Sequence, residues 1–328
     1  MSALSKATRV FATRGIPLEC DVYQAAGYPK NSPVLLFFHS GGLVAGGRQD
    51  IPPWLVQACV KNKWPVVSAS YRLLPQVDGE ALLEDAKAAY EFAQGLDVDG
   101  DQPRRRVIAA GSSAGFFLAT LIAHHLTPKP LALLASSGIP TFRHPFFNSS
   151  HQISNDPVEE DDVERILAEP VSVGTCPSSV FDVNSLHLNG AKTRDFDPSS
   201  TAPVDRKGQH PYRGIIYDYL VQRNEYLAYV GKVDPGFDWA ADKTGNQKKL
   251  SEWPKTVMLQ GDKDEDVDMD VCFSVATKLG DRAHLIMSRG QGHRFGRESF
   301  LEDDPGIMND IMLALVVLEG LVEQALAK

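Results

Sequence analysis

The chain has 328 residues, of which 43% are hydrophobic and 23% are charged, which is the balance of an ordinary globular protein with a core of normal size. Its formal net charge of -9 argues against nucleic acid as a partner, because phosphate binding requires a basic face. The one compact basic run, Arg104 to Arg106, precedes an apolar strand pattern and is interpreted as a solvated loop.

The N-terminal residues and the spacing of the cysteines indicate where the protein is expected to reside and whether it binds a metal. The first residues, MSALSK, contain no apolar stretch after a basic start, so no secretory signal is expected. No apolar run approaches the ~18 residues that spanning a bilayer requires. The cysteines, at positions 20, 59, 176 and 272, have neither metal-ligand nor redox-motif spacing. We therefore expect a cytoplasmic protein with reduced thiols and with no cofactor, metal or membrane partner; its oligomeric state is not predicted.

The first 140 residues alternate between strand and helix patterns. Continuous apolar runs such as residues 34–38 are typical of strands covered on both faces. Strands that alternate with helices require crossover connections, so the pattern predicts a mostly parallel sheet. In chain order, the predicted elements are strands 8–13, 18–23 and 34–38, helix 51–60, strand 66–71, helix 80–94, strand 106–110, helix 116–125 and strand 131–136.

The middle of the chain lacks this alternation. Residues 141–252 are rich in Pro, Asn, Asp and Ser, and only 163–168 and 214–229 have helical patterns. So long a segment inside an α/β chain indicates an inserted cap subdomain rather than a loop. The alternation resumes afterwards, which predicts a core domain made of residues 1–140 and 253–328. Its later elements are strand 255–260, helix 271–279, strand 283–287 and helix 304–327.

The strongest local motif is GSSAG at residues 111–115, between a predicted strand and a predicted helix. A serine on such a sharp turn exposes its hydroxyl at the end of the sheet, and the flanking glycines relieve crowding in the turn. The N-terminus of the following helix favours developing negative charge. The motif therefore predicts that Ser113 is a nucleophile.

A serine hydroxyl requires a base at neutral pH, and in this type of site the acid and the histidine follow the nucleophile along the chain. His293 lies in a glycine-rich loop just after the last predicted strand, from which its imidazole can reach the serine. Seven other histidines lie in helix 116–125, in the predicted cap, or at the start of a strand. We therefore predict that His293 is the base.

The acid is ambiguous, because aspartates alternate along the loop that follows strand 255–260. The candidates are Asp262, Asp264, Asp266 and Asp268. The spacing begins like that of a calcium-binding loop, but it lacks the glycine at the sixth position and the glutamate at the twelfth. Calcium is therefore rejected, and the residues alone leave the choice of acid open.

The segment HSGG at residues 39–42 directly follows the strand pattern 34–38. Glycines at this place allow backbone N–H groups to turn inward, toward the predicted nucleophile. Together with the N–H of Ala114, they can form an oxyanion hole for a tetrahedral intermediate.

Five segments, in this order, resemble the hormone-sensitive-lipase-like branch of the α/β hydrolases, and the overall look is similar to that of its fungal carboxylesterase-like members. They are HSGG at 39–42, VSASYRLLP at 67–75, GSSAG at 111–115, GDKDEDV at 261–267 and GH at 292–293. The resemblance covers nearly all of the chain outside residues 141–252. It implies an α/β-hydrolase fold, with an eight-stranded, mostly parallel sheet flanked by helices and an inserted, mainly helical cap.

The branch's acid motif has glycine, two residues, aspartate, two residues and valine, a register that selects Asp264. The resemblance also implies that Gly41, Gly42 and Ala114 supply the oxyanion N–H groups. This sequence departs from the branch at two positions. Ser40 replaces the first of three glycines, and Ser112 replaces the aspartate that usually precedes the nucleophile.

These residues predict a serine hydrolase that cleaves a small to medium carboxylic ester through an acyl-enzyme. The same triad could act on a lactone, thioester, amide or pathway intermediate. A non-catalytic receptor of the same branch would lack the catalytic histidine, which is present here. Aromatic residues of the cap either line an apolar substrate pocket or form the cap's own core. The predicted pocket residues are Phe142, Phe146, Tyr217 and Tyr219, and Phe147, Tyr212 and Trp239 are further candidates.

Overall fold

The computed structural model describes residues 4–98, 100, 102–153, 156–174, 181–193, 211–242 and 244–327. Its centre is an eight-stranded sheet with the strand order β1-β2-β4-β3-β5-β6-β7-β8. The pairs β1–β2 and β2–β4 are antiparallel, and all the other pairs are parallel. The strands are β1 Leu4–Thr13, β2 Pro17–Ala25, β3 Val34–Phe38, β4 Val66–Ala69, β5 Val107–Ser112, β6 Ala132–Ser136, β7 Lys255–Gly261 and β8 Ala283–Ser288.

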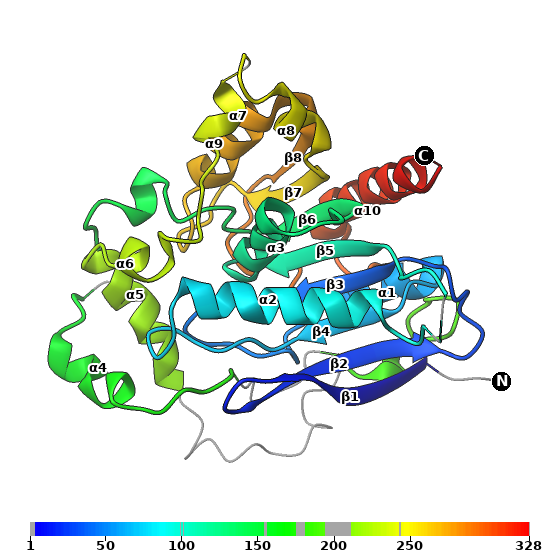
Figure 1. Ribbon diagram of the computed structural model, residues 1–328, viewed down its shortest axis with the longest axis horizontal. Helices are drawn as coiled ribbons and strands as arrows, with labels where there is room; N and C mark the ends of the chain where they lie inside the picture. The colour runs from blue at the N-terminus through cyan, green and yellow to red at the C-terminus, as the bar shows by residue number, and fades with distance from the viewer. Residues whose placement is uncertain are drawn as a thin grey trace.

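Helices cover both faces of this sheet (Figure 1). Alternate residues of β3 enter different hydrophobic clusters: Leu36 and Phe38 pack on one face, and Leu35 and Phe37 pack on the other. The continuous apolar pattern of this strand follows from burial on both sides. Helices α2 Gly79–Gln94, α3 Gly115–His125 and α9 Met269–Leu279 cover the first face, and α1 Pro53–Asn62 and α10 Pro305–Leu326 cover the second.

The closing helix α10 has two different faces. Ile311, Leu315 and Leu318 are buried, whereas Leu313 and Val316 are exposed. With 22 residues and a mean hydropathy of 1.6 over its most apolar 18, α10 is long and apolar enough to cross a membrane. Polar and charged residues interrupt its apolar sequence. In this structure its buried face packs against β6, β7 and β8.

The segment between β6 and β7 is called the insert (residues 141–252), and the regular elements in its described residues are helices. In Figure 1, α4, α5 and α6 lie at one end of the sheet, whereas α7 and α8 lie beside α9. The helices of the insert are η1 Pro145–Phe147, α4 Glu160–Leu167, η2 Val183–Ser185, η4 Pro211–Gly214, α5 Ile215–Gln222, α6 Tyr226–Val230, α7 Asp238–Ala241 and α8 Gln247–Glu252; a further short helix, η5 Gly280–Arg282, precedes β8.

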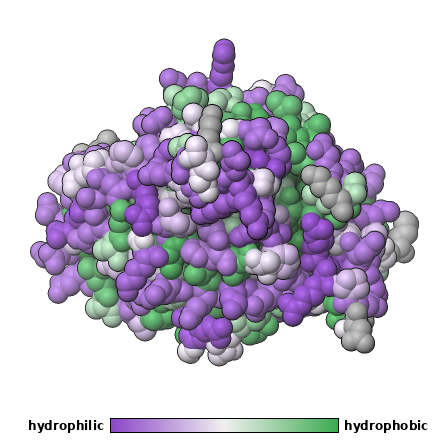
Figure 2. All heavy atoms as spheres, turned by 45° about the horizontal axis from the view of Figure 1, so that its top comes forward, coloured by the Kyte–Doolittle hydropathy of each residue, from purple (hydrophilic) through white to green (hydrophobic). Residues whose placement is uncertain are grey.

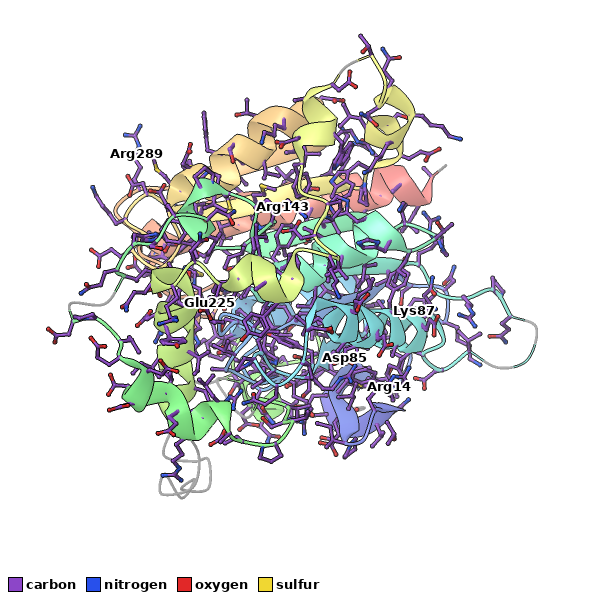
Figure 3. All side chains as sticks on the ribbon, turned by 60° about the vertical axis from the view of Figure 1, so that its left-hand side comes forward. Arg14, Asp85, Lys87, Arg143, Glu225 and Arg289 are labelled. Atoms are coloured by element: carbon purple, nitrogen blue, oxygen red, sulfur yellow. The ribbon has the colours of Figure 1, made fainter. Side chains whose placement is uncertain are left out.

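The prediction of one helix over residues 214–229 is wrong, because two helices occupy this range. Asn224 has a φ of 58°, in the left-handed region, and ends the first helix. Asparagine tolerates that conformation better than most residues, so a hydrophobic pattern that looks continuous is interrupted here. The break turns α6 relative to α5, and in Figure 3 the labelled Glu225 marks the junction.

The described cysteines lie inside the protein. Cys20, Cys59 and Cys272 are buried and free, and Cys176 lies outside the described residues. The face seen in Figure 2 is mostly hydrophilic, with hydrophobic residues reaching it in separate areas.

Candidate active site

Ser113 occupies the turn between β5 and α3. Its φ is 51°, an unfavourable value for a residue with a side chain, and its relative exposure is only 6%. The Ser113 N–H donates to Ser136 O at 3.0 Å, and its carbonyl accepts from the Ile139 N–H at 2.9 Å. A Cβ on Gly115 would lie 2.2 Å from Phe38 O, so only glycine allows α3 to begin this close to the end of β3. Tertiary contacts therefore hold the serine in a strained turn.

His293 and Asp264 come from the loops after the adjacent parallel strands β8 and β7, whose carboxyl ends meet at one edge of the sheet. His293 Nδ1 lies 2.8 Å from Asp264 Oδ2, and the Asp264 side chain is fully buried. Because a carboxylate only accepts, Nδ1 carries the proton, and Nε2 of a neutral imidazole is left to act as a base. Arg289, labelled in Figure 3, begins the loop that carries His293.

Asp264 accepts further hydrogen bonds within its own loop, residues 261–267, called the acid loop. Oδ1 accepts from the N–H groups of Asp266, at 3.1 Å, and Val267, at 2.9 Å. Oδ2 accepts from Gln260 Nε2 at 2.7 Å in addition to His293. Four donors therefore fix both oxygens of the carboxylate.

The other three aspartates have different surroundings. Asp262 accepts from the Gly290 N–H at 2.6 Å, and Asp268 caps α9 by accepting from the Asp270 N–H at 2.8 Å. Asp266 lines the hollow in front of Ser113. Within the described residues, no group of three or more His, Cys, Asp or Glu side chains is arranged to hold a metal ion. The structure thus brings one aspartate of the four to the imidazole.

Three backbone N–H groups near Ser113 are available for an oxyanion. Those of Gly41, Gly42 and Ala114 have no hydrogen-bond acceptor in the part of the chain that the structure describes. In a trans peptide, the direction of each N–H is set by the carbonyl of the preceding residue. The Gly41 carbonyl accepts from the N–H groups of Val44, at 2.9 Å, and Ala45, at 2.8 Å, which orients the Gly42 N–H.

The loop of residues 39–45, called the oxyanion loop, begins with a buried histidine. His39 Nδ1 lies 2.8 Å from Ser40 O, which orients the Gly41 N–H, and the His39 ring stacks on Tyr71 at 4.1 Å. Tyr71 Oη donates to His39 O at 2.9 Å. Burial lowers the pKa of His39 to about 4, and its buried Nε2 has no hydrogen-bond partner among the described residues. His39 is therefore neutral and acts as a fixed donor.

Ser113 and His293 open into one hollow of about 450 Å³, and no hydrogen bond joins their side chains among the described residues. Gly41 and Gly42 lie on its wall. Catalytic hydrogen bonds are often long in ligand-free sites and tighten only with substrate. The remaining wall is mixed polar and apolar, and its charged residues are Asp50, Asp218, Asp266, Arg294 and Arg297.

Of the four predicted pocket residues, Tyr217 lines the hollow, whereas Phe142, Phe146 and Tyr219 do not. Phe142 is fully buried and stacks on Tyr226 at 4.4 Å. Phe146 packs edge-on against Phe147, and Tyr219 is buried on α5. Aromatic residues suit a core as well as a pocket, and sequence spacing does not distinguish the two. Trp239 packs on Trp253, away from the hollow, and the Tyr212 side chain lies outside the described residues.

Two contributors to the site have no sequence signal. Gln260 lies near the end of β7 and has the sequence context of an ordinary strand residue, yet its Nε2 donates a hydrogen bond to Asp264 Oδ2. Tyr226, on α6, donates from Oη to Gly42 O at 2.7 Å. Neither contact belongs to a motif, so only the fold brings these residues to the site.

A second hollow, of about 440 Å³, lies away from the triad at the start of β5. Basic residues dominate its wall, including Arg104, Arg106 and Lys129. The interpretation of residues 104–106 as a solvated loop is wrong for Arg105, which is buried and donates from Nε to Leu96 O at 2.8 Å. This guanidinium satisfies loop carbonyls, which gives it a structural reason to be buried.

Comparison with known proteins agrees with this geometry. A family model described as the α/β hydrolase fold matches residues 35–166. The chain is similar to a solved α/β hydrolase superfamily protein from Enterococcus faecalis, with a TM-score of 0.65 and 17% identity over 97% of this chain and 99% of that one. The chain has the α/β-hydrolase fold, as the sequence predicted. Its motifs are similar to those of the hormone-sensitive-lipase-like branch.

Among curated relatives, the chain is similar to Lipase 2 of Moraxella sp. (strain TA144), with 36% identity over 104 residues. It is also similar to the probable carboxylesterase M8 of Phoma sp., with 31% identity over 101 residues. These matches cover 30% and 27% of this chain, and 23% and 32% of the relatives. The chain therefore matches less than a third of the length of either relative.

The two residues that depart from the branch's pattern, Ser40 and Ser112, both lie at the hollow. Ser40 Oγ donates to Asp50 Oδ2 at 2.7 Å, and Arg297 Nε donates to Asp50 Oδ1 at 2.6 Å. The side chain at position 40 thus ties the oxyanion loop to the loop after His293. Ser112 lines the hollow beside Ser113, where it adds a hydroxyl in place of a charge.

Proposed function

We propose that the chain is a serine hydrolase of carboxylic esters, with Ser113 as nucleophile, His293 as base and Asp264 as the acid that orients it. The observation that carries the proposal is the buried Asp264–His293 pair at 2.8 Å, which opens into the same hollow as the strained Ser113. A protonated Nδ1 held by a carboxylate leaves Nε2 as the base, which is the arrangement that serine activation requires.

In the proposed reaction, Ser113 Oγ attacks the acyl carbonyl carbon while His293 Nε2 takes the hydroxyl proton. The N–H groups of Gly41, Gly42 and Ala114 stabilise the oxygen that becomes negative. The tetrahedral intermediate collapses, and the leaving alkoxide departs with the proton from His293. Water, deprotonated by His293, then attacks the acyl-enzyme, and the carboxylic acid leaves as Ser113 regains its proton.

The names of the curated relatives, a lipase and a probable carboxylesterase, support ester hydrolysis. The dimensions and polarity of the hollow support small to medium acyl or aryl esters rather than long acyl chains. A hollow of about 450 Å³ suits a small molecule, and its wall carries several charged side chains. We propose that the insert acts as a cap over the site, since Gly214, Tyr217 and Asp218 lie on the same wall.

The test is to label the purified chain with a fluorophosphonate probe and to assay a panel of p-nitrophenyl esters of increasing acyl length. We expect labelling at Ser113 and fastest hydrolysis of short acyl groups. Lactones and thioesters in the same panel test whether the triad acts on another acyl substrate. A wild-type chain that is neither labelled nor active on any member would refute the proposal.

A further inference from the structure

The oxyanion loop contains a run of unfavourable backbone conformations. Gly41, Gly42 and Leu43 have φ values of 118°, 64° and 65°, so three successive residues lie in the left-handed region. Glycine has no intrinsic preference between the two signs of φ, and leucine disfavours this one. Contacts from elsewhere in the fold must therefore select the conformation that turns the N–H groups inward.

These contacts are hydrogen bonds to the backbone carbonyls of the oxyanion loop. The Gly41 carbonyl is held within the loop itself, by the N–H groups of Val44 and Ala45. The Leu43 carbonyl accepts from the N–H of Leu74, a residue outside the insert, at 2.9 Å. The next two contacts come from the insert.

The insert supplies the donors for the two remaining carbonyls. Gly42 O accepts from Tyr226 Oη at 2.7 Å, across a sequence separation of 184 residues. Val44 O accepts from Arg213 Nε at 2.8 Å, across 169 residues. Arg213 also donates to Leu74 O at 2.9 Å and pairs with Glu169 at 2.8 Å, so its guanidinium is fixed.

The Tyr226 hydroxyl is itself held firmly. Its side chain is fully buried, and its ring stacks on Phe142 at 4.4 Å and meets Tyr217 at 5.8 Å. Burial raises the pKa of Tyr226 well above its usual range, so the phenol keeps its proton and remains a donor. A buried phenol needs an acceptor, and Gly42 O is the acceptor that it has.

The first residues of the insert are hydrogen-bonded to the segment that follows α6. Asp234, just after α6, accepts from the Thr141 hydroxyl at 2.8 Å and from the Phe142 N–H at 2.8 Å. Arg143, labelled in Figure 3, donates to Gly231 O at 2.6 Å. These bonds join the start of the insert to the end of α6, so Tyr226 reaches the oxyanion loop from a fixed support.

We infer that Tyr226 is a positioning residue for the oxyanion hole, and that the insert is thereby a structural part of the catalytic machinery. The Tyr226 hydroxyl holds the carbonyl of the Gly42–Leu43 peptide. The Gly42 N–H belongs to the preceding peptide, whose carbonyl is held by Val44 and Ala45, so Tyr226 acts on this N–H through the φ of Gly42, which joins the two peptides. Arg213 supports the same loop two peptides further on, at Val44 O. The inference rests on the proposed function, because it concerns transition-state stabilisation at Ser113.

The test uses the full chain and compares Tyr226→Phe with Tyr229→Phe. Tyr226→Phe removes one oxygen atom and keeps the ring that packs on Phe142. Tyr229→Phe is the matched control, because Tyr229 lies on the same helix and its hydroxyl has no hydrogen-bond partner in the described residues. The substrate is the ester that the wild type hydrolyses fastest, and a trifluoromethyl ketone serves as a tetrahedral-adduct inhibitor.

We expect kcat of Tyr226→Phe to fall about ten-fold with KM within about two-fold, which is less than the loss of a direct oxyanion donor. The inhibition constant of the ketone should rise by the same factor as kcat falls, because both depend on the oxyanion hole. A purely structural role would not make these two quantities change together. Tyr229→Phe should match the wild type in all three.

Unchanged kcat in Tyr226→Phe, or a loss confined to KM, would overturn the inference. If Tyr226→Phe fails to fold, as judged by circular dichroism, Arg213→Lys tests the same support through Val44 O and should also lower kcat without changing KM. Unchanged kcat in that variant would overturn the inference as well. Failure of the proposed function is distinguishable, because it would appear as a wild type that is neither labelled nor active.

Discussion

The acid loop and the oxyanion loop meet at Ser113 but are held in opposite ways. Within the acid loop and the adjoining strand end, every donor to Asp264 other than His293 lies within four positions of it: Gln260, Asp266 and Val267. The oxyanion loop instead depends on donors from three separate segments, including Tyr226, 184 residues away. The Asp264 carboxylate is held mainly by its sequence neighbours, and the insert reaches the acid loop only at Asp266 O, where Tyr217 Oη donates at 2.6 Å. The oxyanion loop takes donors from the insert at two of its carbonyls, Gly42 O and Val44 O.

This difference shows why the two loops respond differently to change. A loop that is supported locally keeps its geometry as long as its own residues are present. A glycine-rich loop supported from a distance keeps its geometry only while the distant element is in place. We therefore expect variants of the acid loop to act through His293, and variants of the insert to act through the oxyanion N–H groups.

The largest effect on activity should come from removing the hydroxyl oxygen of Ser113. Ser113→Ala leaves no nucleophile, so we expect kcat to fall by about six orders of magnitude, while the thermal unfolding midpoint stays close to that of the wild type. Fluorophosphonate labelling should vanish in parallel. Peptide mapping that finds the wild-type label on Ser112 would contradict the assignment.

The acid loop can be tested at its centre with Asp264→Asn. An amide at this position favours the wrong imidazole tautomer, so we expect kcat to fall about 10⁴-fold. Asp262→Asn and Asp268→Asn are matched controls, because these carboxylates accept from the backbone instead of from His293, and they should retain most activity.

Asp266 is the alternative acid, since it lines the hollow. If Asp264→Asn keeps near wild-type kcat while Asp266→Asn is inactive, the assignment of the acid is wrong and the local support of Asp264 has no catalytic meaning.

Because His39 is buried in the oxyanion loop, the free energy of unfolding should fall at acid pH. The pKa of His39 is lowered by burial from 6.5 to about 4, so between these values the unfolded chain binds a proton that the folded chain does not. The stability from neutral His39 is complete above pH 6.5 and is lost as the pH falls toward 4, by at most about 3 kcal/mol.

Urea unfolding at pH 7.5 and pH 4.5 measures this loss, with His39→Gln as the comparison. Glutamine can still donate to Ser40 O but does not titrate, so the pH dependence should be smaller in the variant. Some should remain, because burial also lowers the pKa of His124. Equal pH dependence in the two proteins would show that His39 does not contribute.

The smallest effect should come from Gln260→Leu, which removes one of four donors to the Asp264 carboxylate. The remaining backbone donors still hold Oδ1, so we expect kcat to fall only about ten-fold, with a shift in the lower limb of the pH–rate profile. The shift separates an effect on the Asp264–His293 pair from a general loss of stability. A loss as large as that of Asp264→Asn would mean that the acid loop is not self-supporting.

The sequence by itself determined the parallel sheet, the strand-to-helix turn at Ser113 and the loop that carries His293. These features depend on local patterns: apolar runs of strand length, and glycines beside a serine where β5 ends. The choice among four aspartates already needed the resemblance, because the loop's composition is the same for all of them. The structure adds the 2.8 Å contact from Asp264 to His293.

Only the tertiary structure decided which residues of the insert face the site. Asn224 breaks the helical pattern and turns α6, so Tyr226 reaches Gly42 while Phe142 and Tyr219 pack into the core. A buried aromatic residue and a pocket aromatic residue have the same sequence signature, since both are large and apolar. Their roles depend on contacts between segments far apart in the chain, and no local pattern contains that information.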